Sequence, residues 1–440
     1  MRGKSGPRAA CPVPRTSWCP TPHAACRVAH AARCTPPHRA PPPRTRAHPR
    51  PSERLQIGRK RRLGRRTSAR SRQIWHETGE DGGVRDTPYL VVDEGVAEGN
   101  LAAMAAHARA LGVALRPHAK THKTVELARR QLAHGAVGLT VATVGEAEVF
   151  ADAGVVDLFI AYPLWAVGPR AERLRALASR VRLRVGADSV DGVRMLARAM
   201  HAGHHGAVPL AIAVEVDSGH HRSGVPPESA TDVAVEALDA GLVVDGVFTF
   251  PGHSYGADAA GPAAGDEAAA LGQVRDALTA AGIPCPVVSG GSTPSAGAAD
   301  GGVLTELRPG VYVFGDAQQW ELGTMPPHSM ALTAHATVVS RRDGVAVLDA
   351  GSKVLGADRA AYATGYGRLL DHPEARITAL SEHHATVTFP TGAAIPALGE
   401  VLRVVPNHVC NAVNLVDELI IERDGLEVGA WAVAARGRNS

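Results

Sequence analysis

The chain has 440 residues, of which 45% are hydrophobic and 4% aromatic, so it is long enough for two domains whose cores are built from Ala, Val and Leu. Its formal net charge is +4, but residues 1–72 hold 19 of the 47 basic residues and one of the 43 acidic ones, which leaves 28 basic and 42 acidic residues in 73–440. No run of 18 apolar residues occurs, so a membrane span is not expected, and the acidic body is expected to be soluble.

Residues 1–83 form a leader rich in Arg, Pro, Ser and Ala. Such a composition buries too little apolar surface to offset the loss of chain entropy, so we expect this leader to be disordered and irrelevant to catalysis. A nucleic-acid-binding tail, a transit-like or processed leader and a gene start placed too far upstream are the alternatives. Four of the six cysteines lie here without a C-x-x-C pair, so neither a zinc knuckle nor a redox motif is expected.

From residue 84, short β-branched segments alternate with Ala-rich stretches of helical periodicity, such as Leu101 to Leu111. Alternation at this length implies parallel βαβ units, and eight of them match a (β/α)8 TIM barrel. A doubly wound open sheet is the alternative architecture. The expected strands are Val113–Lys120, Gly138–Thr143, Leu158–Tyr162, Val181–Gly186, Pro209–Asp217, Val244–His253, Cys285–Ser289 and Leu304–Tyr312.

Polar residues gather at the carboxyl ends of these expected strands. Active sites of (β/α)8 barrels lie at that face, so the pattern favours an enzyme. The residues concerned are Lys120, Thr143, Tyr162, Asp217, His253, Ser289 and Tyr312.

The tail from about residue 330 predicts a smaller, mostly antiparallel β domain, with Pro88–Val92 pairing into it. We therefore expect an α/β protein divided into the leader 1–83, a barrel over 99–328, and a β domain made of 84–98 plus 329–440. The tail strands are expected at Thr333–Ser340, Gly344–Asp349, Ala385–Pro390, Glu400–Val405 and Glu418–Arg423.

The first expected barrel strand carries the most chemistry. Its alternation places Arg116, His118 and Lys120 on the face that points into the barrel, where polar side chains are unfavourable unless they bind something. A lysine in a partly desolvated mouth has a lowered pKa and acts as a nucleophile or base. A snorkelling or salt-bridged lysine is the simpler interpretation.

Two further motifs suggest ligands. The loop Ser289–Pro294, of sequence SGGSTP, follows the seventh strand, where glycines and hydroxyl donors cradle phosphate in such barrels. His408 and Cys410 are two apart in a strand-like segment, so both would face one side, and zinc suits an imidazole and a thiolate. An ordinary turn and a buried Cys beside a surface His are the corresponding alternatives.

The motif RPHAKTHK at residues 116–123 resembles the cofactor-lysine segment of the D-serine dehydratase and D-threonine aldolase family, which has the alanine-racemase-like fold. The resemblance covers about residues 86–435, and its first and last motifs are the specific ones. It continues through EVDSGHHRSG at 215–224, GHSY at 252–255, ELRPGVY at 306–312, DAGSK at 349–353 and PNHVC at 406–410.

This resemblance implies pyridoxal 5′-phosphate (PLP) as cofactor, held on Lys120 as a Schiff base, with Lys123 a less suitable lysine. It places Arg222 near the phenolic oxygen of the cofactor and Tyr255 near its ring. It assigns a metal, zinc with manganese as alternative, to His408 and Cys410. It gives the phosphate to Gly290, Gly291, Ser292, Thr293 and Tyr312, although Tyr312 is equally well explained as a tyrosine at the core edge, and Asp217-Ser218-Gly219 as an ordinary turn.

The resemblance further implies a cytoplasmic, homodimeric D-serine dehydratase-like ammonia-lyase that converts a D-β-hydroxy amino acid to a 2-oxo acid and ammonia. In it Lys120 removes the α-proton, and the metal assists departure of the β-hydroxyl. A metal-dependent aldolase acting on D-threonine or 3-hydroxyaspartate is the nearest rival, and a non-catalytic PLP-binding protein is the rival of another class. Cys285 and Cys410, the two cysteines of the body, fit a reducing cytoplasm.

Overall fold

The structure is a computed structural model that describes residues 85–202 and 210–440, all within the compact unit Trp75–Ser440. The predicted leader lies outside the described residues, so its disorder stays a prediction. No helix in the described part of the chain is long and apolar enough to cross a membrane.

Eight parallel strands form the first sheet, in the order β2-β9-β8-β7-β6-β5-β4-β3. A parallel bridge between His118 and Thr140 joins the two ends of this order, so the sheet curls into the predicted barrel. The strands are β2 (Ala114–Leu115), β3 (Leu139–Val141), β4 (Asp157–Pro163), β5 (Arg182–Ala187), β6 (Ala211–Glu215), β7 (Val243–Phe248), β8 (Val287–Gly290) and β9 (Glu306–Leu307).

The first strand is shorter than the eight residues predicted, and Pro117 explains why. Proline has no N–H to donate to a ladder, so regular pairing ends at Leu115. The segment nevertheless stays anchored, since Arg116 N donates to Leu307 O at 2.8 Å and His118 N to Pro309 O at 3.0 Å. Lys120 thus lies in a turn just beyond the strand end.

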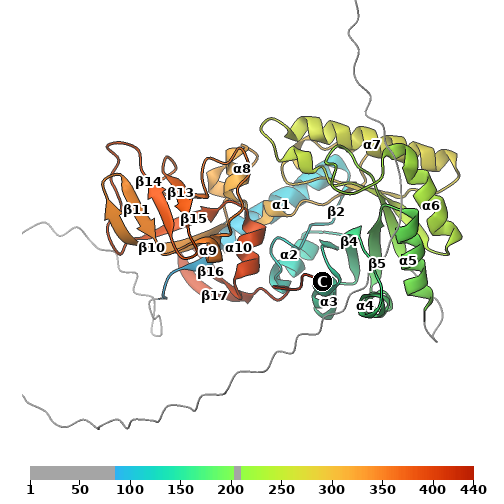
Figure 1. Ribbon diagram of the computed structural model, residues 1–440, viewed down its shortest axis with the longest axis horizontal. Coiled ribbons are helices and arrows are strands. Elements are labelled where there is room, and N and C mark those ends of the chain that lie inside the picture. Colours follow the sequence, from blue (N-terminus) through green and yellow to red (C-terminus); the bar gives the residue numbers. More distant parts are fainter. Residues whose placement is uncertain (1–84, 203–209) are drawn as a thin grey trace, which may run out of the picture. The chain divides into compact units, whose positions relative to one another are not determined.

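Helices follow the strands around the outside of the barrel (Figure 1). Buried Ala, Val and Leu side chains fill the layer between them, as the low aromatic content predicted. The helices are α1 (Glu94–Leu111), α2 (Val125–Ala133), α3 (Val144–Asp152), α4 (Pro169–Ala178), α5 (Val190–His201), α6 (Ala230–Asp239) and α7 (Ala260–Ala280).

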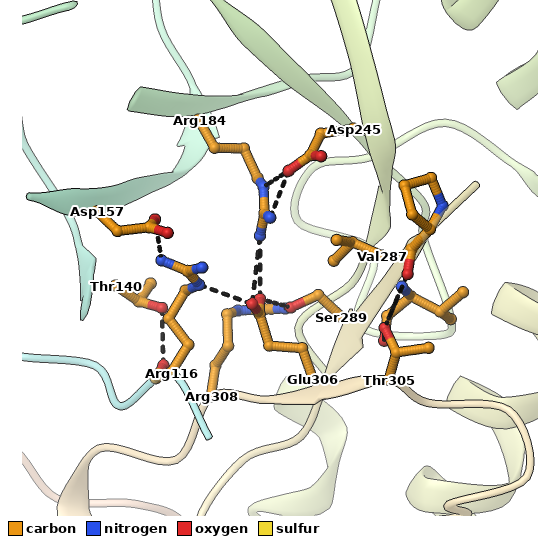
Figure 2. Close-up of polar contacts among 12 residues, drawn as sticks. Arg116, Thr140, Asp157, Arg184, Asp245, Val287, Ser289, Thr305, Glu306 and Arg308 are labelled. Carbon is orange, nitrogen blue, oxygen red and sulfur yellow. Dashed lines mark hydrogen bonds and ion pairs between the residues drawn. The ribbon is translucent and has the colours of Figure 1, made fainter. Parts of the chain in front are cut away.

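The barrel interior holds a buried ion network centred on Glu306 (Figure 2). Arg116 Nε lies 2.7 Å from Glu306 Oε2, and Arg184 Nη1 lies 3.1 Å from Glu306 Oε1. Burial alone would raise the pKa of Glu306, but these two guanidinium groups hold it below its usual value. Arg116 therefore points inward as predicted, and its partners are carboxylates of the barrel.

The second sheet has nine strands, nearly all antiparallel. As predicted, the strand before the barrel joins it: β1 pairs antiparallel with β10 and parallel with β16. β12, β13 and β17 were not predicted. The strands are β1 (Tyr89–Asp93), β10 (Leu332–Arg342), β11 (Val345–Leu348), β12 (Gly367–Leu369), β13 (Arg376–Leu380), β14 (Ala385–Thr388), β15 (Val401–Pro406), β16 (Glu418–Arg423) and β17 (Leu426–Ala432), and the helices of this part are α8 (Ala317–Glu321), α9 (Ser352–Leu355) and α10 (Val409–Leu415).

Candidate active site

A cavity of about 840 Å³ opens at the carboxyl ends of the barrel strands, and α10 closes one side of it. Its size is that of a pocket for a cofactor together with a small substrate. Of the strand-end residues singled out in the sequence, Lys120, Thr143 and Tyr162 line this cavity. Ser289 belongs to the ion network instead, where its hydroxyl donates to Glu306.

Asp217 and His253 contact residues outside the cavity. Asp217 accepts from the backbone N–H of Gly219 at 2.9 Å and from that of His221 at 3.0 Å, which is the role of an ordinary turn residue. His253 Nε2 lies 3.3 Å from Asp266 Oδ2. Neither residue is among those that line the cavity.

Lys120 is the only lysine of the described residues that lines the cavity. Lys123 is buried and ion-paired with Glu146 at 3.1 Å, and Lys353 is exposed and ion-paired with Glu382 at 2.7 Å. Within the described part of the chain, the Lys120 amine has no hydrogen bond or ion pair, and it lies over the Phe250 ring, 5.6 Å from the ring centre.

Burial lowers the pKa of Lys120 below that of a free lysine, and Arg222 lowers it further, while Cys410 acts in the opposite direction. A half-buried amine with a lowered pKa is suited to nucleophilic attack or to proton transfer. The preceding His118 is held neutral for the same reason, since burial and the charge of Lys120 lower its pKa well below the usual value.

Arg222 and Tyr255 both line the cavity, as the resemblance implied. The Arg222 guanidinium lies 5.1 Å from the centre of the Phe250 ring, and that ring packs tilted against Tyr255 at 6.3 Å. Lys120, Arg222 and Tyr255 therefore all lie around Phe250, a residue that sequence reasoning missed.

The predicted phosphate loop follows β8 and presents Gly291, Ser292 and Thr293 to the cavity. Gly290 does not line it. A side chain at Gly290 would place its Cβ 2.3 Å from Glu267 Oε1, and Gly291 has φ +83°, so only glycines allow this turn.

Tyr312 lies behind the same loop. Its backbone N–H donates to Thr293 Oγ1 at 3.1 Å, and its hydroxyl accepts from Gln131 Nε2 at 3.1 Å. Tyr312 lines a second, smaller pocket of about 270 Å³ on the other side of Thr293. It therefore shapes the loop from behind.

His408 and Cys410 line the same cavity as Lys120, but the predicted strand that would join them is wrong. β15 ends at Pro406, His408 has the extended conformation of a helix N-cap, and Cys410 lies in the first turn of α10. The two side chains converge because the chain changes from strand to helix between them.

Two polar residues orient this pair. His408 Nδ1 lies 3.4 Å from Asp316 Oδ2, and Cys410 Sγ lies 3.3 Å from Thr121 Oγ1. Burial alone would raise the pKa of Cys410, but the positive charges of His408 and Lys120 hold it below its usual value. An imidazole and a thiolate directed into a cavity are a donor set that fits zinc, and a carboxylate behind the imidazole is the usual support for a metal-binding histidine.

No group of three or more His, Cys, Asp or Glu residues arranged to hold a metal occurs among residues 85–202 and 210–440. His408 and Cys410 are a pair of candidate metal ligands that line the cavity. Asp316 was missed in the sequence because its pattern, Asp316-Ala-Gln-Gln, indicates only the N-cap of α8 that it also forms.

Comparisons with known proteins cover both parts of the described chain. The family model "Alanine racemase, N-terminal domain" matches residues 92–318, and "Putative serine dehydratase domain" matches residues 331–421. The D-threo-3-hydroxyaspartate dehydratase of Delftia sp. (strain HT23) is 37% identical over 74% of this chain and 91% of its own length. The D-threonine aldolase of Arthrobacter sp is 35% identical over 80% of this chain and 93% of its own length.

Solved structures of proteins with the same two activities also match this chain. The D-threonine aldolase from Filomicrobium marinum superposes with a TM-score of 0.72 at 35% identity, over 80% of this chain and 96% of its own. Two other similar structures are alanine variants of D-threo-3-hydroxyaspartate dehydratase, one at a histidine and the other, in the metal-free form, at the cysteine two positions later. Together these matches show that the chain belongs to the D-serine dehydratase and D-threonine aldolase family of PLP-dependent lyases, with the alanine-racemase-like fold.

Proposed function

We propose that this protein is a PLP- and zinc-dependent, D-serine dehydratase-like ammonia-lyase that converts a D-β-hydroxy amino acid to a 2-oxo acid and ammonia. The observation that carries the proposal is the convergence of Lys120 with His408 and Cys410 on one cavity. Lys120, which would anchor the cofactor, and His408 and Cys410, which would hold the metal, would thus face the same substrate.

The residues of the cavity fit PLP. Lys120 offers a half-buried amine that has no hydrogen bond or ion pair within the described residues, and the loop Gly291–Thr293 offers the Thr293 hydroxyl for a phosphate. Arg222 would hold the phenolic oxygen and Tyr255 would lie near the ring, while Gly290 and Tyr312 would support the phosphate loop from behind. When bound, PLP supplies an electron sink for the bonds at the substrate's α-carbon.

The chain's own groups then have defined tasks. Lys120 removes the proton from the α-carbon, and its lowered pKa makes the neutral amine available for that transfer. His408 and Cys410 would hold the metal, which supplies Lewis acidity at the β-hydroxyl. The buried Asp316 fixes the imidazole of His408, and Thr121 contacts the sulfur of Cys410.

The rival function is cleavage between the α- and β-carbons, because relatives with both activities match this chain. Elimination is favoured by the solved dehydratase variants, in which a histidine and a cysteine two positions apart were replaced. That spacing is the spacing of His408 and Cys410.

A product assay separates the two functions. We expect the protein loaded with PLP and zinc to release a 2-oxo acid and ammonia in equal amounts from D-serine or D-threo-3-hydroxyaspartate, and nothing from the L-enantiomers. The 2-oxo acid is measured by reduction with lactate or malate dehydrogenase, and glycine and aldehyde by chromatography. Glycine and an aldehyde as the main products would show that the protein is an aldolase.

The proposal also includes the division into a barrel over residues 99–328 and a β domain made of 84–98 plus 329–440. It includes a homodimer and a cytoplasmic location. The last is supported by the two cysteines of the described chain, Cys285 and Cys410, which are both free thiols.

A further inference from the structure

Glu267 is a buried carboxyl group for which the reaction described above has no use. It lies on α7 with 0% of its surface exposed, directly behind the loop that would hold the cofactor's phosphate. Its Oε1 accepts the backbone N–H of Gly291 at 2.7 Å. Its Oε2 is buried and has no hydrogen-bond partner within the described residues.

The hydrogen bond from Gly291 to Glu267 reduces the number of donors that the loop can direct at a ligand in the cavity. Gly291 lines the cavity, but its N–H already points back to Glu267. The Ser292 hydroxyl is hydrogen-bonded to Ser254 Oγ and Ser295 Oγ, both at 2.8 Å, so the Thr293 hydroxyl remains as the side-chain donor of this loop. Gly290 packs so closely on Glu267 that a Cβ would come within 2.3 Å of Oε1. The carboxyl group therefore fixes the backbone of the Gly290-Gly291 turn.

An ionised Glu267 would place a negative charge one hydrogen bond away from a loop that is meant to bind a dianion. We propose that Glu267 is a positioning residue for the cofactor's phosphate, holding the Gly290-Gly291 turn as a neutral carboxylic acid whose ionisation weakens phosphate binding. This inference rests on the proposed function, because it assumes that the phosphate lies at the loop Gly291–Thr293.

The surroundings of Glu267 favour the neutral form. Burial raises its pKa to about 7, opposed by the hydrogen bond from Gly291 and by the charge of Arg308. Arg308 lines the cavity; it donates to Ser289 Oγ at 2.6 Å (Figure 2), and Ser289 donates on to Glu306 at 2.6 Å. Its charge is thus shared with the ion network.

Glu267 forms no ion pair with the described residues of that network. Arg116 and Arg184 pair with Asp157, Asp245 and Glu306, and Asp157 also pairs with Arg182. Arg308 is the cation whose charge acts on Glu267, and that charge also acts on Glu306 and Glu215.

The other charged groups on the elements that pack against α7 also have their own partners or lie on the outer helices. His253 of the 3₁₀ turn Gly252–Ser254 is paired with Asp266, and Asp245 of β7 with Arg184. The remaining charges on these elements are acidic; they are Glu228, Asp232 and Asp239, together with Glu236, which is paired with Arg194.

The affinity of the loop for phosphate should fall as the pH rises. Below about pH 7 Glu267 is protonated and the loop is neutral, so phosphate binds best. As the pH rises through 7 the carboxylate forms and repels the phosphate. A bound phosphate that raises the pKa of Glu267 by one unit corresponds to about a tenfold loss of affinity above that pH.

The test uses apoprotein and pyridoxamine 5′-phosphate, which has the phosphate but no aldehyde and so binds without a covalent bond to Lys120. Its dissociation constant is measured by calorimetry from pH 6 to 8.5, beside pyridoxamine, which lacks the phosphate. Three variants are compared with the unmodified protein: Glu267→Gln, Glu267→Ala, and Asp266→Asn as a control for an exposed carboxylate on the same helix.

We expect the unmodified protein and Asp266→Asn to lose about tenfold in affinity for the phosphate probe over this range. Glu267→Gln keeps the acceptor for Gly291 without the charge, so it should retain the affinity seen at pH 6 throughout. Glu267→Ala should bind weakly at every pH, because the turn has lost its support. Melting temperatures of the variants identify any that fail to fold, and Glu267→Gln carries the decision.

Two results overturn the inference. If Glu267→Gln loses affinity with pH as steeply as the unmodified protein, or binds as weakly as Glu267→Ala at pH 6, Glu267 does not act as a neutral positioning group. If instead the unmodified protein binds both probes equally at every pH, the proposed cofactor site itself is wrong. The two failures are therefore distinguishable.

Discussion

Lys120→Ala should abolish the visible absorbance of bound PLP and lower turnover by roughly 10⁴-fold, the upper end of what a general base contributes. The expected loss is large because one amine both anchors the cofactor and moves the α-proton. No second amine of the described residues lines the cavity to replace it.

Borohydride reduction followed by peptide mapping identifies the lysine that carries the cofactor. Residues 73–440 contain only three lysines, Lys120, Lys123 and Lys353, so the assignment is unambiguous. Lys353→Ala is the matched control, since this lysine is exposed and paired with Glu382, and it should leave absorbance and turnover unchanged. Cofactor found on Lys123 or Lys353 would refute the site.

Cys410→Ala should keep the absorbance of bound PLP but lower turnover at least about 100-fold, which corresponds to roughly 3 kcal/mol of lost transition-state stabilisation. The reason is that Cys410 would serve the metal, whereas the cofactor would be held by Lys120 and the phosphate loop. Chelation of the unmodified protein should have the same effect, and zinc should restore only that sample. Metal content is measured by mass spectrometry beside the kinetics.

Two further variants sharpen this result. Cys285→Ala removes the other free thiol of the described chain, which does not line the cavity, and should change nothing. Cys410→Asp replaces the soft thiolate by a hard oxygen ligand, so activity should shift in preference from zinc toward manganese. Full activity in both chelated protein and Cys410→Ala would mean that His408 and Cys410 have only a structural role.

The fold could be predicted because its signals are local. β-Branched segments alternating with Ala-rich helical periods gave all eight barrel strands in order. Of the seven polar residues at the predicted strand ends, Lys120, Thr143 and Tyr162 line the cavity. The first and eighth strands were predicted too long, because the predicted segments continue past Pro117 and Pro309, and a proline cannot donate to a backbone ladder. β12, β13 and β17 were missed; β12 is only three residues long, and β17 is almost entirely exposed, so neither shows a clear pattern.

The site was only partly predictable, because its remaining contacts join residues far apart in the chain. Asp316 meets His408 across 92 positions, and Thr121 meets Cys410 across 289. Asp316 is recognisable in the sequence only as a helix cap. Likewise the pairing of Glu267 with Gly291 has no local signature, since a glutamate in an Ala-rich helix normally indicates an exposed face.

The most direct test of the account is a crystal structure of the protein loaded with PLP and zinc, with anomalous data collected at the zinc edge. We predict one strong anomalous peak about 2.0–2.1 Å from a His408 nitrogen and about 2.3 Å from Cys410 Sγ. Continuous density should join Lys120 Nζ to the cofactor in the same cavity. Zinc bound away from His408 and Cys410, or a cofactor joined to any other lysine, would contradict the claim that one cavity combines the two.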